Sequence, residues 1–546
     1  MRTARSTSFA AATSWRFSHY AGLFFDEFRP DSAWLRETAV LQLPPCEGLA
    51  GLTLRGEIHP HPDVRGLESS APGLDCLLDG RIVARLRDLR PGPFEVSIPL
   101  SAQCANRGPR IGLRLCGVGL TNLLAWLGRM TRLAPLQRFR SQNKNRQLRI
   151  LSLATADGET VFDFSIRSAP YSAAFARRHA RLGLNIAGFL AADLGVGESA
   201  RCMVRAADAA SLPTALVPLK LHCRNRLGDQ TYAARLQDTN PHRINVVHLD
   251  PPASRDLDHH HGKPFRAGKY NIAYWAWELP EFPDAWLENF AYFDEVWCPS
   301  DFVRAAISLK SPVPVLTMPH AISFARPQGD FRPRFGLPAG KFLFLALYDL
   351  NSYSERKNPA AAIAAFRQSG LAGQGAALVV KVQNVAGNEA DFTALRDSVR
   401  DLPNTVLLTD TLTRDEVYQL ESACDCFVSL HRSEGFGLAI AECMFLGKPV
   451  ISTDWSGTAE FVNAHTGCPV RCTLTTIAQS RGPYAKGQTW AEPDAAHAAE
   501  WMRRLFADRA LAAAIGAAGR AAIEEMFSPA VIGTRYRRRL DAIACF

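Results

Sequence analysis

Two glutamates flank a glycine turn in the carboxyl-terminal half of the chain. The stretch Ser429–Glu442 reads SLHRSEGFGLAIAE and places Glu434 and Glu442 eight positions apart. The apolar run Cys426–Leu430 predicts a strand before the turn, and a helix is expected from about Leu438. Glycines let a ligand approach the backbone, and the first turn of a helix offers free N–H groups to an anion. The two carboxylates can therefore face one pocket and hold two parts of an anionic, hydroxyl-rich molecule.

A second candidate site follows the expected strand Phe342–Leu347. The stretch Tyr348–Pro359 reads YDLNSYSERKNP and contains the adjacent cations Arg356 and Lys357 just before a predicted helix. Guanidinium and ammonium groups form strong, charge-assisted hydrogen bonds with phosphate oxygens. At the carboxyl end of a strand this pair suits a diphosphate, and a solvated basic pair is the alternative.

The middle of the chain carries weaker signals. Leu194–Arg201 is a glycine turn that opens a helix, which suits either a phosphate or a purely structural tight turn. His248 follows a buried strand, where it is a candidate for a ligand pocket or a structural histidine. Arg255–His261 (RDLDHHH) has metal-binding side chains, but three consecutive histidines rarely converge on one ion. We therefore expect a loop there and no metal site.

The elements that must position these residues are organised as several domains, because 546 residues exceed one core. After a disordered tail (1–30), short alternating segments with Asp-Gly turns predict an all-β, sandwich-like domain over 31–170. Strands then alternate with helices, which predicts two doubly wound parallel sheets, at 182–328 and 338–527. A helix over 528–546 follows, and its arginines form a solvated or docking face.

The expected strands of the first parallel sheet are Leu184–Leu190, Thr214–Pro218, Ile244–Leu249, Ile272–Trp275, Glu295–Cys298 and Val313–Met318, with helices at Pro283–Tyr292 and Ser300–Leu309. Those of the second are Phe342–Leu347, Ala377–Val382, Thr405–Leu408, Cys426–Leu430 and Pro449–Thr453. The stretch Arg326–Gly340, rich in proline and glycine, predicts the linker between them.

One basic segment interrupts the β region. Between Glu95 and Asp157 there are ten basic residues and no acidic one. Within it, residues 118–147 place leucines and Met130 on one face of a helix, with Trp126 beside them. Such a helix can lie on an anionic membrane surface, or it can pack on a neighbouring domain and keep a solvated basic face.

The composition of the chain narrows its expected location and its expected partners. Thirteen cysteines without paired spacing indicate reduced thiols in a cytoplasmic protein. In the membrane alternative for 118–147, this segment would place the protein peripherally on the inner face of a membrane. The N-terminus resembles either a transit peptide or, as we expect, a disordered tail, and no apolar run is long enough for a transmembrane helix. The net charge of +9 suits an anionic partner, but no nucleic-acid recognition motif accompanies it.

Taken together, the motifs resemble family 4 retaining glycosyltransferases. The donor half of that family is similar to Arg356–Pro359, Ser429–Glu442, Gly447–Ile451 and Asp454–Gly457, and the acceptor half to Leu194–Arg201, Tyr274–Pro280 and Asp294–Ser300. The resemblance covers about 182–530. It implies a GT-B fold, in which two Rossmann-like domains face each other across a cleft, and the β domain would be an accessory.

The resemblance also implies roles for single residues. Glu434 would contact the donor sugar, and Glu442 the ribose of a nucleotide-diphosphate sugar. The backbone of Gly435, Phe436, Gly437 and Leu438 would face the donor. Lys357, with Arg356, would neutralise the diphosphate, and Gly197 would close from the other domain, where His248 and Glu278 would shape the acceptor site. No cofactor and no essential metal are expected.

One departure concerns the diphosphate arginine. Many members place it about six positions before the lysine, where this chain has Asn351, so the direction in which Arg356 points is open. The resemblance predicts transfer to a glycan or lipid-linked acceptor in surface polysaccharide or glycolipid biosynthesis. A nucleotide-sugar epimerase on the same fold and a non-catalytic glycan-binding protein are the alternatives. The donor sugar, the acceptor and the linkage stay open.

Overall fold

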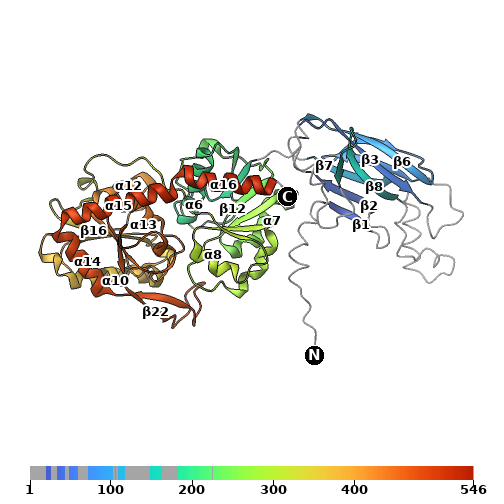
Figure 1. The fold of residues 1–546 in the computed structure, drawn as a ribbon. Coiled ribbons are helices and arrows are strands. Elements are labelled where there is room, and N and C mark those ends of the chain that lie inside the picture. The colour runs from blue at the N-terminus through green and yellow to red at the C-terminus, as the bar shows by residue number, and fades with distance from the viewer. Residues whose placement is uncertain are drawn as a thin grey trace, which may run out of the picture.

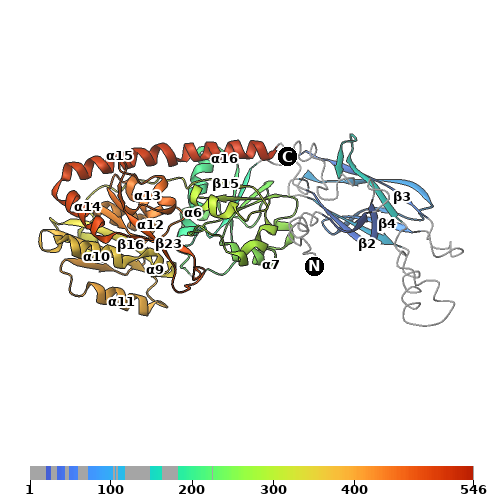
Figure 2. The ribbon, with the colours of Figure 1, turned by 60° about the horizontal axis from the view of Figure 1, so that its bottom comes forward.

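The computed structural model describes residues 20–25, 33–43, 48–59, 72–102, 105, 109–116, 148–162, 183–223 and 225–544. Figure 1 shows two α/β domains side by side and a β domain beyond them, and Figure 2 shows the same arrangement from another side. The predicted change from an all-β region to alternating strands and helices is confirmed.

The N-terminal domain is a nine-stranded antiparallel sheet that folds over one apolar core. Its strands are β1 (Tyr20–Phe25), β2 (Ala33–Gln42), β3 (Gly51–Ile58), β4 (Gly73–Leu78), β5 (Arg81–Leu86), β6 (Gly92–Pro99), β7 (Arg110–Cys116), β8 (Leu148–Thr155) and β9 (Thr160–Phe162). β2 joins two halves of the sheet, because its first residues pair with β8 and its last five pair with β7. Leu41, Leu54 and Leu113 are fully buried in the shared core.

Two predictions for this region have different outcomes. The tail predicted over 1–30 is too long, since Tyr20–Phe25 forms β1 against β2. An unbroken apolar run such as YAGLFF lacks the alternation by which half-buried strands are recognised. The basic segment 118–147 lies outside the described residues, so its helix and membrane contact stay predictions. Within the part of the chain that the structure describes, no helix combines the length and apolar character needed to cross a membrane.

The first α/β domain has a six-stranded parallel sheet in the order β11-β10-β12-β13-β14-β15. The strands are β10 (Leu184–Gly188), β11 (Thr214–Pro218), β12 (Ile244–His248), β13 (Tyr270–Tyr274), β14 (Glu295–Cys298) and β15 (Val315–Thr317). Every residue of β10, β12 and β14 is buried, as expected for a sheet covered on both faces. Helices α6 (Gly195–Ala209) and α8 (Asp301–Ser308) are close to the predicted ones, whereas Asp284–Tyr292 is a 3-10 helix.

The second α/β domain has a six-stranded parallel sheet in the order β18-β17-β16-β19-β20-β21. The strands are β16 (Phe342–Asp349), β17 (Ala376–Gln383), β18 (Thr405–Leu408), β19 (Cys426–Ser429), β20 (Val450–Thr453) and β21 (Cys468–Val470). The main helices are α10 (Pro359–Ser369), α11 (Glu389–Val399), α12 (Arg414–Ala423), α13 (Leu438–Phe445) and α14 (Ala495–Ala507). The five predicted strands are confirmed, and β21 is an additional edge strand.

A hairpin between β21 and α14 was not predicted. Strands β22 (Cys472–Thr476) and β23 (Thr489–Pro493) pair with each other, and we call residues 472–493 the arm. Figure 1 shows the arm running from the second α/β domain towards the first. Its Ile477, Tyr484 and Trp490 share an apolar cluster with Trp277 of the first domain. The arm is therefore a contact between the two domains.

The last two helices return the chain to the first α/β domain. Helix α15 (Arg509–Phe527) covers the second domain, and α16 (Pro529–Ala544) lies against α6, as Figures 1 and 2 show. The ring of Tyr536 stacks on Trp297 at 5.2 Å between centroids. Arg539 forms an ion pair with the fully buried Glu295. Arg537 also docks, through a hydrogen bond to the Ala210 carbonyl, whereas Arg535 and Arg538 are exposed, so each of the two alternatives holds for part of the basic face.

Candidate active site

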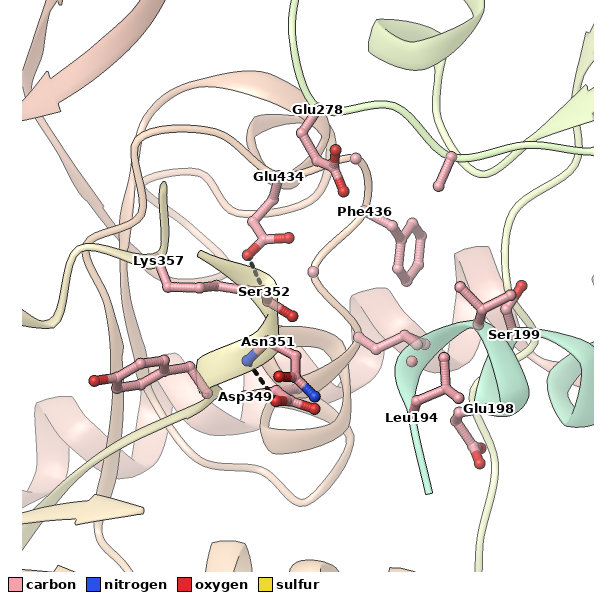
Figure 3. A pocket seen from close by; sticks show the side chains of 18 of the residues that line it. Leu194, Glu198, Ser199, Glu278, Asp349, Asn351, Ser352, Lys357, Glu434 and Phe436 are labelled. Atoms are coloured by element: carbon pink, nitrogen blue, oxygen red, sulfur yellow. Dashed lines mark hydrogen bonds and ion pairs between the residues drawn. The ribbon is translucent and has the colours of Figure 1, made fainter. Parts of the chain in front are cut away.

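A cavity of about 810 Å³ lies between the two α/β domains. Figure 3 shows the side chains that line it, with Glu434 and Lys357 from the second domain facing Leu194 and Ser199 at the start of α6. Its walls are the loops at the carboxyl ends of strands from both sheets. This is where parallel sheets place their ligand sites.

The predicted glycine turn forms the wall between β19 and α13. Gly437, at φ +91, is the residue before the helix, and a Cβ atom there would come within 2.7 Å of Thr458. Gly435 lies where the domains meet, since its carbonyl accepts a hydrogen bond from the Ser300 hydroxyl at 2.5 Å. A Cβ on Gly435 would be 3.1 Å from the carbonyl oxygen of Trp277. Both glycines thus permit close packing against Trp277 and Thr458, and the approach of a ligand to their backbone stays a prediction.

Glu434 is the centre of a buried ion-pair cluster. Its Oε1 is 2.5 Å from the Lys357 Nζ, and its Oε2 is 3.1 Å from an Arg356 nitrogen. Burial raises the pKa of Glu434, but the two cations outweigh burial and lower it to about 2. Burial lowers the pKa of Lys357, which Glu434 opposes. The carboxylate is therefore ionised at neutral pH and is held beside cations that can turn to an incoming phosphate.

The structure answers which way Arg356 points. Its guanidinium is buried, donates to the carbonyl of Ser433 at 2.9 Å, and lies 3.9 Å from the Glu278 carboxylate. The Arg356 carbonyl accepts from the Arg432 N–H at 2.8 Å, which fixes the short helix that carries it. Arg356 thus points into the cavity and lies between carboxylates of the two domains.

Glu442 lies one turn inside α13, lines the cavity and is paired with Arg414. Arg414 begins α12, and its Nε is 3.6 Å from Glu198 on α6. Glu198 in turn binds Arg201 at 2.8 Å and Arg205 at 2.5 Å. Burial raises the pKa of Glu198, but the three arginines outweigh it and hold the pKa well below its ordinary value. A chain of alternating charges therefore connects the two domains behind Glu442.

Two predicted residues do not line the cavity. Gly197 packs against its own domain, where a Cβ would be 2.7 Å from the carbonyls of Phe189 and Ala192. Gly195, two residues earlier, lines the cavity instead. His248 is fully buried, stacked on Tyr274 at 4.4 Å, with its Nδ1 3.1 Å from the Ser199 hydroxyl. His248 is therefore structural, the alternative stated for it.

The other predicted residues do line the cavity. They are Glu278, Gly435, Phe436 and Leu438, together with Gly437. Phe436 packs its ring against His320, with centroids 4.8 Å apart. In the described ranges, no three His, Cys, Asp or Glu side chains are grouped as metal ligands, and Leu257–His261 is a short helix.

Three cavity residues were missed in the sequence. Arg414 follows a capping-box threonine, and that signal predicts only the start of a helix. Tyr484 belongs to the unpredicted arm. Asp250, only two residues after His248, stands at the carboxyl end of β12 and could have been named by the same reasoning.

Comparison with known proteins gives a family match for the second α/β domain. Residues 330–522 match the model of the family described as glycosyl transferases group 1. The chain is also 26% identical, over 204 residues, to the human alpha-1,3/1,6-mannosyltransferase ALG2. That match covers 35% of this chain and 44% of the relative, so it spans less than half of the relative's length.

Similar solved structures include Anabaena HepE in complex with UDP and glucose, and sucrose-phosphate synthase from Thermosynechococcus elongatus. HepE is 14% identical, with a TM-score of 0.48, and the match covers 66% of this chain and 100% of HepE. The synthase is 16% identical, with a TM-score of 0.49, and the match covers 66% of this chain and 99% of the synthase. With its two facing parallel-sheet domains this chain has the GT-B fold, and its residues 330–522 are similar to the group 1 glycosyl transferases.

Proposed function

We propose that this chain is a retaining glycosyltransferase that moves a sugar from a nucleotide-diphosphate sugar to a hydroxyl group of a glycan or lipid-linked acceptor. The observation that carries the proposal is the arrangement of Lys357, Arg356 and Glu434 beside the open start of α13 in the interdomain cavity. The family match over residues 330–522 supports it.

The residues would divide the work as follows. The N–H groups at the start of α13 and the Lys357 ammonium receive the diphosphate. The Glu434 carboxylate lies beside the donor sugar and stabilises the positive charge that develops at its anomeric carbon. Glu442 accepts from the ribose hydroxyls once Arg414 turns towards Glu198.

The reaction exchanges one carbon–oxygen bond for another. The bond from the anomeric carbon to the phosphate oxygen breaks, and a bond to the acceptor oxygen forms on the same face of the sugar. The acceptor proton passes to the departing nucleoside diphosphate, whose charge Lys357 balances. No metal ion is needed in this scheme.

The setting of the reaction is also part of the proposal. Surface polysaccharide or glycolipid assembly at the cytoplasmic face of a membrane fits the basic segment 118–147. The ten cysteines of the described residues, all free, fit a reducing compartment.

The test begins with a panel of nucleotide sugars, and the similarity to a mannosyltransferase makes a mannose nucleotide the first choice. A bound donor should raise the melting temperature of the full chain by mass action. Transfer to acceptor glycosides is then measured for wild type and Glu434→Gln. The substitution should lower kcat by about 10²–10³-fold, the loss typical when one preorganised charge is removed.

The control is Glu524→Gln, an exposed glutamate paired with Arg520 at 2.9 Å on α15, which should retain full activity. Equal transfer by Glu434→Gln and wild type would refute the site. Conversion of a nucleotide sugar to its epimer without any acceptor would indicate the epimerase instead.

A further inference from the structure

Two carboxylates lie together on the first-domain side of the cavity. Asp250 stands two residues after β12, and Glu278 stands four residues after β13. These strands are parallel neighbours, with His248 opposite Tyr274, so both loops leave the same edge of the sheet. Both side chains line the cavity. The Asp250 carboxylate is exposed to it and has no hydrogen-bond or ion-pair partner among the described residues.

Glu278 is held from the second domain. The Tyr484 hydroxyl donates to its carboxylate at 3.1 Å, and Arg356 lies 3.9 Å from the same group. The Ser433 hydroxyl donates to the Glu278 carbonyl, which fixes the backbone as well. Glu278 is therefore fixed in position by groups of the second domain, and one of them, Arg356, also pairs with Glu434.

The arm closes this side of the cavity. Tyr484 stacks on Trp277 at 5.7 Å and meets the edge of Tyr353 at 5.4 Å between ring centroids. Gln488 donates to the carbonyl of Glu281 at 3.1 Å. The half-buried ring of Trp286 lines the same wall and packs edge-on against Trp277 at 4.9 Å. The wall is thus aromatic, with carboxylates between the rings.

The charges at this end of the cavity are unequal. Arg356 is shared by Glu434 and Glu278, and Lys357 is paired with Glu434. Asp250 is left without a cation among the described residues, and the nearby charge of Glu278 adds to the negative potential there. A phosphate would be repelled here, whereas a sugar hydroxyl can donate to a carboxylate and its C–H face can pack on an aromatic ring.

We propose that Asp250, Glu278 and Tyr484 form the acceptor subsite, and that this subsite takes a neutral, hydroxyl-bearing sugar ring rather than a phosphate group. The inference rests on the proposed function, because it presumes that a nucleotide sugar occupies the Lys357 side. Asp250 accepts a hydrogen bond from the acceptor, and Tyr484 positions Glu278 to do the same.

The experiment uses the full chain and the nucleotide sugar that stabilises it. Transfer is measured to methyl glycosides and to the corresponding sugar phosphates. Wild type should use the methyl glycosides. Asp250→Asn should raise the acceptor KM about tenfold, the equivalent of one charge-assisted hydrogen bond. Tyr484→Phe keeps the ring packing and should raise the acceptor KM by less than Asp250→Asn does. Asp238→Asn, an exposed site in the same domain, is the matched control.

The outcomes separate the two proposals. If wild type binds and turns over no nucleotide sugar, the proposed function fails. If wild type transfers sugar but prefers sugar phosphates, or if Asp250→Asn keeps the wild-type acceptor KM, the acceptor subsite is wrong and the function stands. The shift of melting temperature by the donor shows that each variant is folded.

Discussion

Helices α6 and α13 both begin at the cavity, one in each α/β domain, and their first turns are filled differently. The first turn of α6 contains Glu198, which is buried and surrounded by arginines. Neither helix has a side-chain cap, but the first turn of α13 contains no acidic residue. The start of a helix attracts negative charge. Glu198 supplies that charge at α6, whereas no acidic side chain supplies it at α13.

This difference shows which domain is prepared for an anion. At α6 the Glu198 carboxylate supplies a negative charge, and Asp229 and Glu442 pair with two of the three arginines around it. At α13 the N–H groups stand free behind Gly437, with Lys357 nearby. The diphosphate of a donor is therefore expected at α13, while the first turn of α6 is already occupied by a buried cluster of ion pairs. The following predictions test this contrast, from the largest expected effect to the smallest.

The internal acid of α6 can be removed. Glu198→Gln leaves three arginines without their shared carboxylate, so the free energy of unfolding should fall by about 3–5 kcal/mol, as for other broken buried pairs. Urea unfolding of the full chain measures it. The exposed Glu524→Gln should change stability by less than about 1 kcal/mol. A similar small change for both variants would show that the α6 turn is not stabilised by this charge.

An acid can be added to α13. Ala439→Glu places a carboxylate in the first turn, where the donor phosphate is expected, and should weaken nucleotide-sugar binding by about tenfold or more. Ala439→Gln is a control of nearly equal size without the charge. Isothermal titration with the donor measures both. If the two variants bind alike, size and not charge matters at this turn, and the open helix end is not the phosphate site.

The difference in stability between wild type and Glu198→Gln should depend on pH through the ionisation of Glu198. The folded-state pKa of Glu198 lies below its ordinary value of 4.5. Its stabilising contribution is therefore complete above that value and is lost as the pH falls below it. The stability difference between wild type and Glu198→Gln should stay constant from pH 7 to 5. Below about pH 4.5 it should shrink by up to about 1.4 kcal/mol per pH unit. A constant difference at pH 4 would contradict the lowered pKa.

The sequence predicted the cavity residues of the second α/β domain more accurately than those of the first. The turn Ser429–Glu442 is local, because the strand, both glycines and both glutamates lie within a few residues of each other. The positive φ of Gly437 is a local feature of that turn, whereas the tight contacts of the two glycines with Trp277 and Thr458 come from distant parts of the chain. The parallel strands were predictable for a related reason, since each is a short, continuous apolar run.

The missing features depend on contacts between distant parts of the chain. Nothing near Arg414 indicates that Glu198 and Glu442 lie on either side of it. The arm has no strong strand signal, and its position depends on the aromatic core of the other domain. His248 and Asp250 are two residues apart at a strand end, where one faces the core and the other the cavity. The packing of α6 on β12, where Ser199 contacts His248, decides which of the two residues faces the core.

The return of α16 to the first domain has a mechanical consequence. The chain crosses between the α/β domains twice, before β16 and after α15, and the two crossings are joined by a hydrogen bond from the Ile322 N–H to the Phe527 carbonyl at 2.8 Å. Figure 1 shows the arm at the opposite edge of the interface. The two domains are therefore joined at both edges, by the covalent chain beside α15 and α16 and by side-chain contacts at the arm. Any separation of the domains at the arm would have to break the hydrogen bond from Tyr484 to Glu278.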